Sequence, residues 1–205
     1  MKLYHFPASP NSRRVQLTAA HLGIKFDEQQ VVDITKGEQK TPEYLALNPN
    51  GFTPTLVDGD LVLWESRAIA QYLAEKKPEA GLTGRNVSER ADIARWQCWD
   101  AGHLMPQMFT LVWELLVKAM LKLGAPDQPA VDSANEQVSR FLQVLDASLT
   151  GRQYLVGGRL TLADLTVAAS LTYTDALKLP IGDFPQVRDW FGRIQALDAW
   201  KKTQP

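Results

Sequence analysis

The stretch from residue 48 to residue 70, NPNGFTPTLVDGDLVLWESRAIA, decides the fold. Two short apolar runs in it, TLV and LVLW, flank an Asp-Gly pair, which is a strong signal for a β-hairpin. Pro54 stands at the entry to the first run, where a missing backbone N–H is tolerated. From Ile69 onward the apolar residues follow helical spacing. The stretch therefore predicts two antiparallel strands followed at once by a helix.

Glu65 and Ser66 fall at the predicted junction between the second strand and the helix. The start of a helix presents free N–H groups and a partial positive charge, so it readily holds a carboxylate or a phosphate. Ser66 adds a hydroxyl there, and Glu65 adds a partner for a cation, so one small zwitterion would satisfy both. The same two residues also fit a plain helix start, with Ser66 as the cap and Glu65 as a solvated acid of the first turn.

Composition limits the class of protein. The 205 residues are 45% hydrophobic and 22% charged, so the chain can bury a sizeable core. A net charge of −1 argues against a general nucleic-acid binder, which needs a basic face. No apolar run of membrane-spanning length and no secretion signal is evident, and the single cysteine, Cys98, excludes an internal disulfide. These features predict a cytoplasmic protein without a membrane partner.

Strand signals occur only in the first part of the chain. Residues 1–78 read as a mixed α/β domain, residues 79–87 as a polar, glycine-rich linker, and residues 88–205 as an all-helical domain. A β-α-β unit followed by a β-β-α unit, with an X-Pro pair before the third strand, indicates a thioredoxin-like plan. The expected strands lie at 2–6, 25–32, 55–57 and 61–64.

Two features stand out in the predicted helical domain. Pro106 lies inside a long helical pattern, and proline removes a backbone hydrogen bond, so a kink or an interruption is expected there. Thr161 and Asp164 form a capping box, with Asp in place of the usual Glu, ahead of a mostly apolar run. That run predicts a helix buried on most sides.

Ser9 is the candidate for sulfur chemistry. The first 97 residues contain no cysteine, so any sulfur handled by the α/β domain must come from a ligand. A hydroxyl that donates to a thiolate contributes roughly 1.5–3 kcal/mol, which would lower the thiol pKa by about one to two units. Ser9 followed by Pro10 also fits a helix cap and first helical residue, and the two roles are compatible.

No motif indicates a metal site or a tightly bound cofactor. His5, His21 and His103 lack metal-ligand spacing, and the sequence holds no P-loop, dinucleotide-binding motif or nucleophile elbow. Lys40, at the end of a polar run, fits either a solvated loop or a group that holds a second carboxylate of the ligand.

Five segments, in their order and spacing, make the sequence similar to the cytosolic glutathione S-transferases along essentially the whole chain. The similarity is greatest to serine-type members of the phi-like and theta-like groups. This resemblance implies a thioredoxin-like domain, an all-helical domain and a homodimer. The segments are PASPNSRRV at 7–15, GEQK at 37–40, NPNGFTP at 48–54, DGDLVLWESRAIAQYL at 58–73 and GGRLTLADLTVAAS at 157–170.

The resemblance also implies roles for particular residues. Ser9 would activate the thiol of glutathione, and Glu65 and Ser66 would bind its γ-glutamyl end. Thr53, which precedes the family's cis-proline at Pro54, would pair backbone to backbone with the cysteinyl unit.

Other positions are less typical of the family. Gln39 and Lys40 match residues near the glycine carboxylate, although phi-like members often have His where this chain has Gln39. Phe52 stands where a polar residue is common. Asn11 and Ser12 lie close enough to Ser9 to compete for the thiolate.

The predicted function is a transferase that uses glutathione as co-substrate and directs its thiolate at an apolar electrophile. The electrophile is expected against the first long helix of the helical domain, at residues that fit a plain helical core equally well. Two alternatives remain: a non-catalytic glutathione-binding or regulatory module, and a glutathione-dependent dehalogenase, isomerase or peroxidase. The candidate residues of the second site are Met105, Met108, Phe109 and Trp113.

Overall fold

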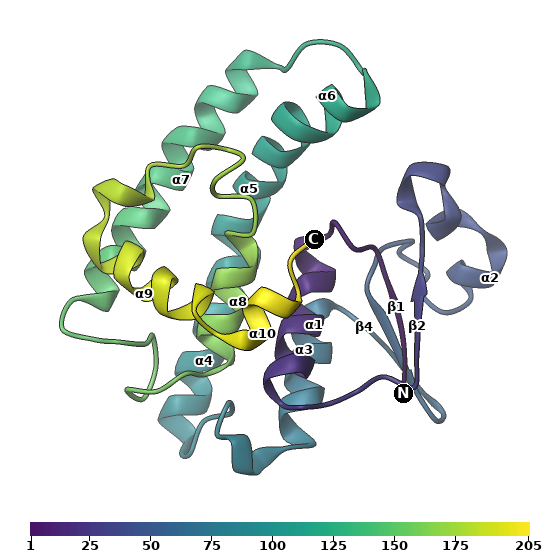
Figure 1. Cartoon of the computed structure of the whole chain (residues 1–205), viewed down its shortest axis with the longest axis horizontal. Helices are drawn as coiled ribbons and strands as arrows, with labels where there is room; N and C mark the ends of the chain where they lie inside the picture. Colours follow the sequence, from purple (N-terminus) through teal and green to yellow (C-terminus); the bar gives the residue numbers. More distant parts are fainter. The chain divides into compact units, whose positions relative to one another are not determined.

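The computed structural model describes residues 1–205 and divides into two compact units (Figure 1). One unit combines Met1–Thr83 with the last segment, Leu197–Pro205, and the other comprises Gly84–Ala196. The predicted domains at 1–78 and 88–205 differ from these units, because the end of the chain groups with the N-terminal unit. The expected linker at 79–87 spans the boundary, and a turn of 3₁₀ helix, Pro78–Ala80, overlaps its start.

A four-stranded sheet forms the centre of the N-terminal unit. Its strand order is β2-β1-β3-β4, with β1 and β2 parallel and the other neighbours antiparallel. The predicted hairpin is confirmed, and Asp58 pairs with Leu61 across its turn. The strands are β1 (Lys2–His5), β2 (Glu28–Val31), β3 (Thr55–Asp58) and β4 (Leu61–Trp64).

Helices cover the two faces of this sheet. Successive side chains of a strand point to opposite faces, so Leu3 and Tyr4 of β1 face different layers. Leu3 packs with Leu56 and Ile69 in the core beneath α1 and α3, whereas the ring of Tyr4 meets that of Tyr44 in α2, with centroids 6.0 Å apart. The helices are α1 (Pro10–His21), α2 (Pro42–Leu45) and α3 (Ser66–Glu75), with short 3₁₀ turns at Ile34–Lys36 and Glu38–Lys40.

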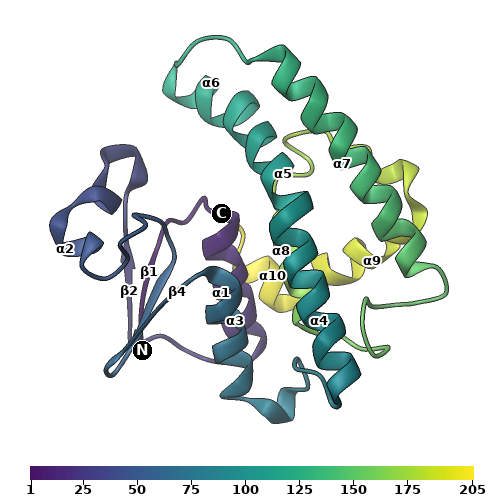
Figure 2. The same ribbon diagram turned by 180° about the vertical axis from the view of Figure 1, so that it is seen from behind.

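The last helix, α10 (Asp198–Lys202), lies beside α1 in both views of the chain (Figures 1 and 2). The guanidinium of Arg13 stacks 3.6 Å from the centroid of the Trp200 ring and donates to the Trp200 carbonyl oxygen at 3.2 Å. Both side chains are almost fully buried. This contact explains why the C-terminal segment belongs to the N-terminal unit.

The second unit is entirely helical, as predicted. A kink or an interruption is expected at Pro106; the first helical run is continuous there, so the interruption is absent. A π-helical turn, Asp100–Leu104, ends two residues before Pro106. The elements are α4 (Val87–Trp99), π turn Asp100–Leu104, α5 (Met105–Leu111), π turn Val112–Val117, α6 (Lys118–Leu121), α7 (Gln128–Leu149), α8 (Leu162–Ser170), a 3₁₀ turn at Ile181–Asp183 and α9 (Pro185–Gln195).

By length and composition alone, the run Val87–Leu121 could cross a membrane, which differs from the expectation that no apolar run reaches that length. Core helices of soluble proteins meet the same criterion. Within the run, Leu104, Met108 and Leu111 are fully buried in the unit, and Glu114 and Lys118 form an ion pair. Part of the apolar surface of the run is therefore used in packing, since 28% of its most apolar window is buried.

The capping box at the start of α8 is present as predicted, and every residue of α8 is buried. Oδ2 of Asp164 accepts from the N–H of Thr161 at 2.9 Å and from its hydroxyl at 3.0 Å. Oδ1 accepts from the N–H of Leu155 at 2.9 Å and from the indole N–H of Trp190 at 3.0 Å. One carboxylate thus joins the start of α8 to a loop and to α9.

A second carboxylate of the helical unit, Glu89, makes the stability of that unit depend on pH in acid. Hydrogen bonds from Arg159 at 2.8 Å and from the N–H of Arg85 at 2.9 Å lower the pKa of Glu89 from its ordinary 4.5 to about 2. Because the folded pKa is the lower one, this stabilisation is complete above 4.5 and is lost as the pH falls towards 2.

We therefore expect Glu89→Gln to remove part of the loss of stability between these two pH values. The free energy of unfolding in urea, measured at intervals of pH, should fall less steeply for the variant than for the parent chain. Glu136→Gln is the matched control, because Glu136 is exposed and makes no hydrogen bond. Parallel pH profiles for parent and Glu89→Gln would contradict the expectation.

Candidate active site

A small pocket of about 90 Å³ opens in the N-terminal unit where the loop before β3 meets the start of α3. It brings together the sequence-predicted residues of the hairpin stretch and one residue of α1. Polar groups dominate its lining, and they come from three separate segments of the chain. The lining residues are Asn11, Asn48, Phe52, Thr53, Pro54, Glu65, Ser66 and Arg67.

The strand-to-helix junction has an unusual backbone. Glu65 has a φ of 71°, in the region that side chains other than glycine rarely adopt, and it occupies the cap position of α3 without a capping side-chain bond. Ser66 is the first residue of the helix, so its interpretation as a plain helix cap is wrong. The junction instead leaves the Glu65 side chain exposed beside the free N–H groups of α3.

Ser66 is held by a fully buried arginine. Nη1 of Arg14 donates to the Ser66 hydroxyl at 2.7 Å and to Oδ1 of Asn11 at 2.6 Å, and the Ser66 hydroxyl lies 3.4 Å from the same Asn11 oxygen. Arg14 is 0% exposed and Ser66 is 4% exposed. The guanidinium places a positive charge behind the start of α3, where the helix dipole already favours an anion.

Sequence reasoning missed this arginine. The signal was present, because two arginines stand side by side in a helix whose neighbouring positions, Val15 and Leu17, are apolar and buried. At least one of the pair must then face the interior, and both are buried here; a buried guanidinium needs hydrogen-bond acceptors. Nothing in the local pattern could identify Ser66, 52 positions away, as one of them.

Hydrogen bonds from Tyr44 and Asn48 hold the loop before β3 in place. The Tyr44 hydroxyl and the Asn48 amide each donate to the carbonyl oxygen of Phe52 at 2.7 Å. The peptide bond between Thr53 and Pro54 is cis, as the resemblance implied. These contacts position the Thr53 backbone at the edge of the pocket, and the Phe52 side chain is 71% exposed there.

Gln39 and Lys40 do not line this pocket. They belong to a 3₁₀ turn, Glu38–Lys40, that lies against the loop before β3. A Cβ added to Gly51 would come within 3.2 Å of the Gln39 carbonyl oxygen, which shows how closely the two segments approach. Lys40 is exposed and forms no ion pair, so its ammonium group is available to an anion.

Ser9, Asn11 and Ser12, the three candidates for the thiolate donor near the start of α1, differ in their hydrogen bonds. The Ser9 hydroxyl oxygen accepts from the N–H of Ser12 at 3.4 Å and so caps the helix. This bond uses a lone pair of the oxygen, so the hydroxyl hydrogen remains able to donate. Ser12 is 0% exposed, and its hydroxyl accepts from the N–H of Phe6 at 3.1 Å. Asn11 uses its Oδ1 to accept from Arg14. Of the two hydroxyls, Ser9 is therefore the more accessible, because it is partly exposed and Ser12 is fully buried.

The four candidates for the second-substrate site lie in the helical unit and differ in exposure. Met108 is 1% exposed and belongs to the core of that unit. Met105 is half-buried, whereas Phe109 is 61% and Trp113 is 39% exposed. Only the last two present large apolar surfaces to solvent.

Comparisons with known proteins identify the family of this chain. Residues 8–76 match the family model described as "Glutathione S-transferase, N-terminal domain", and residues 104–198 match "Glutathione S-transferase, C-terminal domain". Glutathione S-transferase 3 of Zea mays is 39% identical, over 99% of this chain and 92% of the relative. FtsZ-localized protein A of Caulobacter vibrioides is 33% identical, over 95% of this chain and 86% of the relative.

A solved structure has the same fold. The structure of glutathione S-transferase-I bound with lactoylglutathione superimposes with a TM-score of 0.90 and 31% identity, over 99% of this chain and 97% of that one. Both family models and full-length relatives thus match the two units in the expected order. This chain belongs to the glutathione S-transferase family.

Proposed function

We propose that this glutathione S-transferase holds the γ-glutamyl end of glutathione at Glu65 and Ser66 and directs the Ser9 hydroxyl at its thiol. One observation carries the proposal: Arg14, Asn11 and Ser66 form a hydrogen-bonded cluster directly behind the start of α3, beside an exposed carboxylate. The α-carboxylate of glutathione would accept from Ser66 and from the helix N–H groups. Its ammonium group would pair with Glu65.

The rest of the tripeptide follows the pocket edge in this proposal. The cysteinyl unit pairs with the backbone of Thr53 beside Pro54, and the glycine carboxylate lies near Gln39 and Lys40. The fixed loop supports this placement, because the Phe52 carbonyl already accepts two hydrogen bonds and holds the Thr53 backbone in one position.

The chemistry requires a thiolate and an electrophile. Ser9 donates its hydroxyl hydrogen to the sulfur and lowers the thiol pKa, and the start of α1 favours the same negative charge. The thiolate sulfur then forms a bond to an electrophilic carbon, and the leaving group departs with the electron pair of the broken bond. Positioning and thiolate stabilisation supply the catalysis. The exposed rings of Phe109 and Trp113 suit an apolar electrophile.

The oligomeric state and the cellular location of the enzyme are part of the same proposal. A homodimer in the cytoplasm fits the family and a sequence with a single cysteine. Size-exclusion chromatography with light scattering tests the dimer directly.

Binding of glutathione to Glu65 and Ser66 can be tested with two conservative variants. We expect Glu65→Gln and Ser66→Ala each to raise the dissociation constant of glutathione by about tenfold, since each removes one hydrogen bond to a charged group. Calorimetric titration measures the constants. Asp60→Asn is the control, because Asp60 is exposed in the hairpin turn and makes no hydrogen bond. Unchanged affinity in both site variants would exclude the proposed orientation of the ligand.

Arg14 offers an independent test of the same site. Arg14→Lys keeps the charge but replaces the guanidinium, whose Nη1 donates to both Asn11 and Ser66, by an ammonium group on a shorter side chain. We expect the dissociation constant of glutathione to rise by about tenfold and the melting temperature to fall, because a buried network is broken. Arg85→Lys, at an exposed position, should change neither value. Full affinity in Arg14→Lys would mean that Ser66 does not depend on the guanidinium.

One relative favours a second candidate function. FtsZ-localized protein A has a name that refers to localisation and to no transfer reaction. A binding or regulatory module of this kind would keep Glu65 and Ser66 and would bind glutathione without turnover. Conjugation of glutathione to chlorodinitrobenzene separates the two functions: measurable turnover supports the transferase, and tight binding without turnover supports the module.

A further inference from the structure

The loop before β3 presents an aromatic ring to solvent at the rim of the proposed glutathione site. The Phe52 side chain is 71% exposed, and it lines the small pocket beside Thr53 and Glu65. Hydrogen bonds from Tyr44 and Asn48 to the Phe52 carbonyl oxygen fix the backbone that carries the ring, and neither bond depends on the side chain. The loop therefore holds an apolar surface at the edge of the pocket.

The neighbours of Phe52 in the loop place it near the third residue of a bound tripeptide. Gly51, which precedes it, approaches the 3₁₀ turn closely, because a Cβ added to Gly51 would lie 3.2 Å from the carbonyl oxygen of Gln39. Thr53, which follows it, is the proposed partner of the cysteinyl unit. Phe52 thus lies between the cysteinyl position and the turn that carries Lys40, which is the proposed place of the glycine end.

This end of the site combines apolar surface with one available cation. A Cβ added to Gly51 would also lie 3.4 Å from Cδ2 of Leu45, and the Leu45 side chain is 37% exposed. Lys40 is exposed and forms no ion pair. The acid of the same turn, Glu38, is engaged elsewhere, because its Oε2 accepts from the N–H of Asp33 at 2.7 Å. A ligand residue that has a carboxylate and an apolar side chain would match both features.

We propose that this enzyme prefers thiol tripeptides of the form γ-glutamyl-cysteinyl-X in which X has an apolar side chain, and that Phe52 determines the preference. The inference rests on the proposed function, since it concerns the same site. The carboxylate of X pairs with Lys40, and the side chain of X packs against Phe52 and Leu45. Glycine has no side chain, so glutathione leaves this surface in contact with water. Removal of apolar surface from water favours the larger peptide.

Three peptides that differ only in X test the preference: glutathione, γ-glutamyl-cysteinyl-leucine and γ-glutamyl-cysteinyl-serine. All three keep the γ-glutamyl end, the thiol and the terminal carboxylate, so the other proposed contacts are the same. In calorimetric titrations of the full chain, we expect the leucine peptide to bind about fivefold more tightly than glutathione, because part of its side chain leaves water. The serine peptide adds bulk without apolar surface and should bind no more tightly than glutathione.

Variants of Phe52 locate the contact. Phe52→Gln should abolish the preference, so that the leucine peptide and glutathione bind within about twofold of each other, whereas Phe52→Leu should keep most of it. Neither variant should change the melting temperature, because the Phe52 side chain is exposed and the loop is held through its backbone. In turnover with chlorodinitrobenzene, the leucine peptide should lower KM of the parent enzyme without changing kcat.

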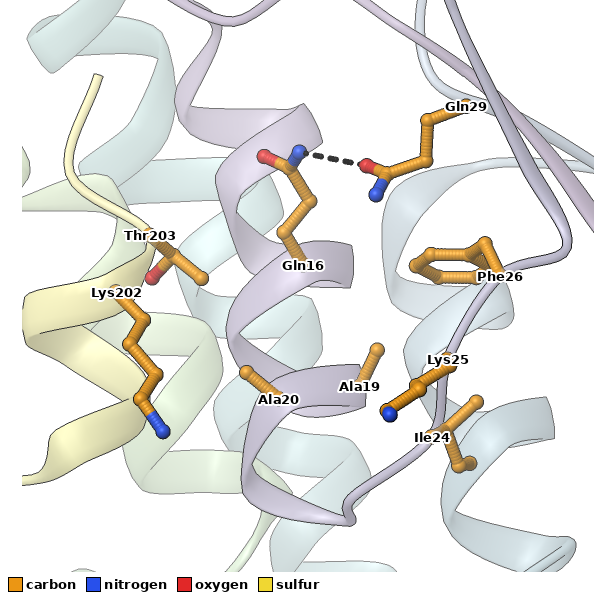
Figure 3. Close-up of a pocket in the computed structure, with 9 residues that line it drawn as sticks. All are labelled: Gln16, Ala19, Ala20, Ile24, Lys25, Phe26, Gln29, Lys202 and Thr203. Carbon is orange, nitrogen blue, oxygen red and sulfur yellow. Dashed lines mark hydrogen bonds between the residues drawn. The ribbon is translucent and has the colours of Figure 1, made fainter.

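A second opening of the N-terminal unit provides the control for non-specific binding of the apolar side chain. It lies between α1, the loop after α1 and α10, with Ile24 and Phe26 in its lining (Figure 3), and it shares no lining residue with the proposed glutathione pocket. Ala20→Gln introduces a polar side chain there from an exposed helix position and should leave the preference unchanged. Loss of the preference in Ala20→Gln would place the contact outside the proposed site and would overturn the inference.

Two further results would also overturn the inference. One is equal affinity of the parent chain for the leucine peptide and glutathione, and the other is an unchanged preference in Phe52→Gln. Both results leave the proposed function intact, since glutathione itself still binds. Failure of all three peptides to bind would contradict the proposed function, and the inference would be wrong with it.

Discussion

Replacing Asp164 by alanine should lower the free energy of unfolding of the helical unit by about 3–5 kcal/mol. The Asp164 side chain is 0% exposed, and its two oxygens accept four hydrogen bonds from Thr161, Leu155 and Trp190. Alanine would leave these donors buried without an acceptor, and each unsatisfied donor costs about 1–3 kcal/mol before any relaxation. The loss is among the largest that a single substitution produces.

We expect the charge of the Asp164 carboxylate to contribute less to stability than its hydrogen-bonding geometry. Burial raises the pKa of Asp164, while the donors around it act in the opposite direction. Asp164→Asn keeps the shape and the acceptor for Leu155 and Trp190, but its amide faces the N–H of Thr161. We therefore expect the asparagine variant to lose less stability than the alanine variant.

Urea unfolding followed by tryptophan fluorescence measures both losses, because Trp190 is buried beside Asp164. Asp175→Ala is the matched control in the same unit, since Asp175 is exposed and its side chain makes no hydrogen bond. A loss below about 1 kcal/mol in Asp164→Ala would show that water or a rearranged loop satisfies the released donors.

Ser9→Ala is the second substitution with a large expected effect, here on catalysis. A thiol with its reference pKa near 8.5 is only slightly ionised at neutral pH. Loss of a hydrogen bond worth roughly 1.5–3 kcal/mol would return the pKa of bound glutathione towards that value, by about one to two units. We therefore expect kcat/KM to fall by about 10–100-fold, while the dissociation constant of glutathione changes less than about threefold.

Two readouts distinguish this effect from a loss of the helix cap. The ultraviolet absorbance of the thiolate, followed against pH, gives the pKa of bound glutathione, and Ser9→Thr should keep it low. Ser12→Ala removes the acceptor of the Phe6 N–H and should lower stability without raising that pKa. A full rate in Ser9→Ala would assign thiolate stabilisation to Asn11 or to backbone N–H groups.

Much of this architecture follows from local sequence patterns. The hairpin with its Asp-Gly turn, the Ser9 cap and the capping box of Thr161 and Asp164 each depend on residues within a few positions of one another. Such short-range signals fix backbone geometry through turn and cap chemistry. The same signals placed Glu65 and Ser66 at the start of a helix, where the structure has them.

Other features depend on partners that are distant in sequence. Arg13 and Trp200 are 187 positions apart, so no local pattern could show that α10 returns to the N-terminal unit. The same holds for Arg14 and Ser66, whose contact converts a helix start into a candidate carboxylate site. At Pro106 the expected interruption is wrong, because the helical run is continuous there and a π-helical turn precedes the proline.

The central claim is that this chain binds glutathione and ionises its thiol. Calorimetric titration with glutathione at neutral pH, in two buffers of different ionisation enthalpy, measures affinity and proton release together. The account predicts binding with release of a proton, and a smaller release for Ser9→Ala. Binding without proton release would contradict the assigned role of Ser9 and would favour a glutathione-binding module. No binding at all would contradict the site at Glu65 and Ser66.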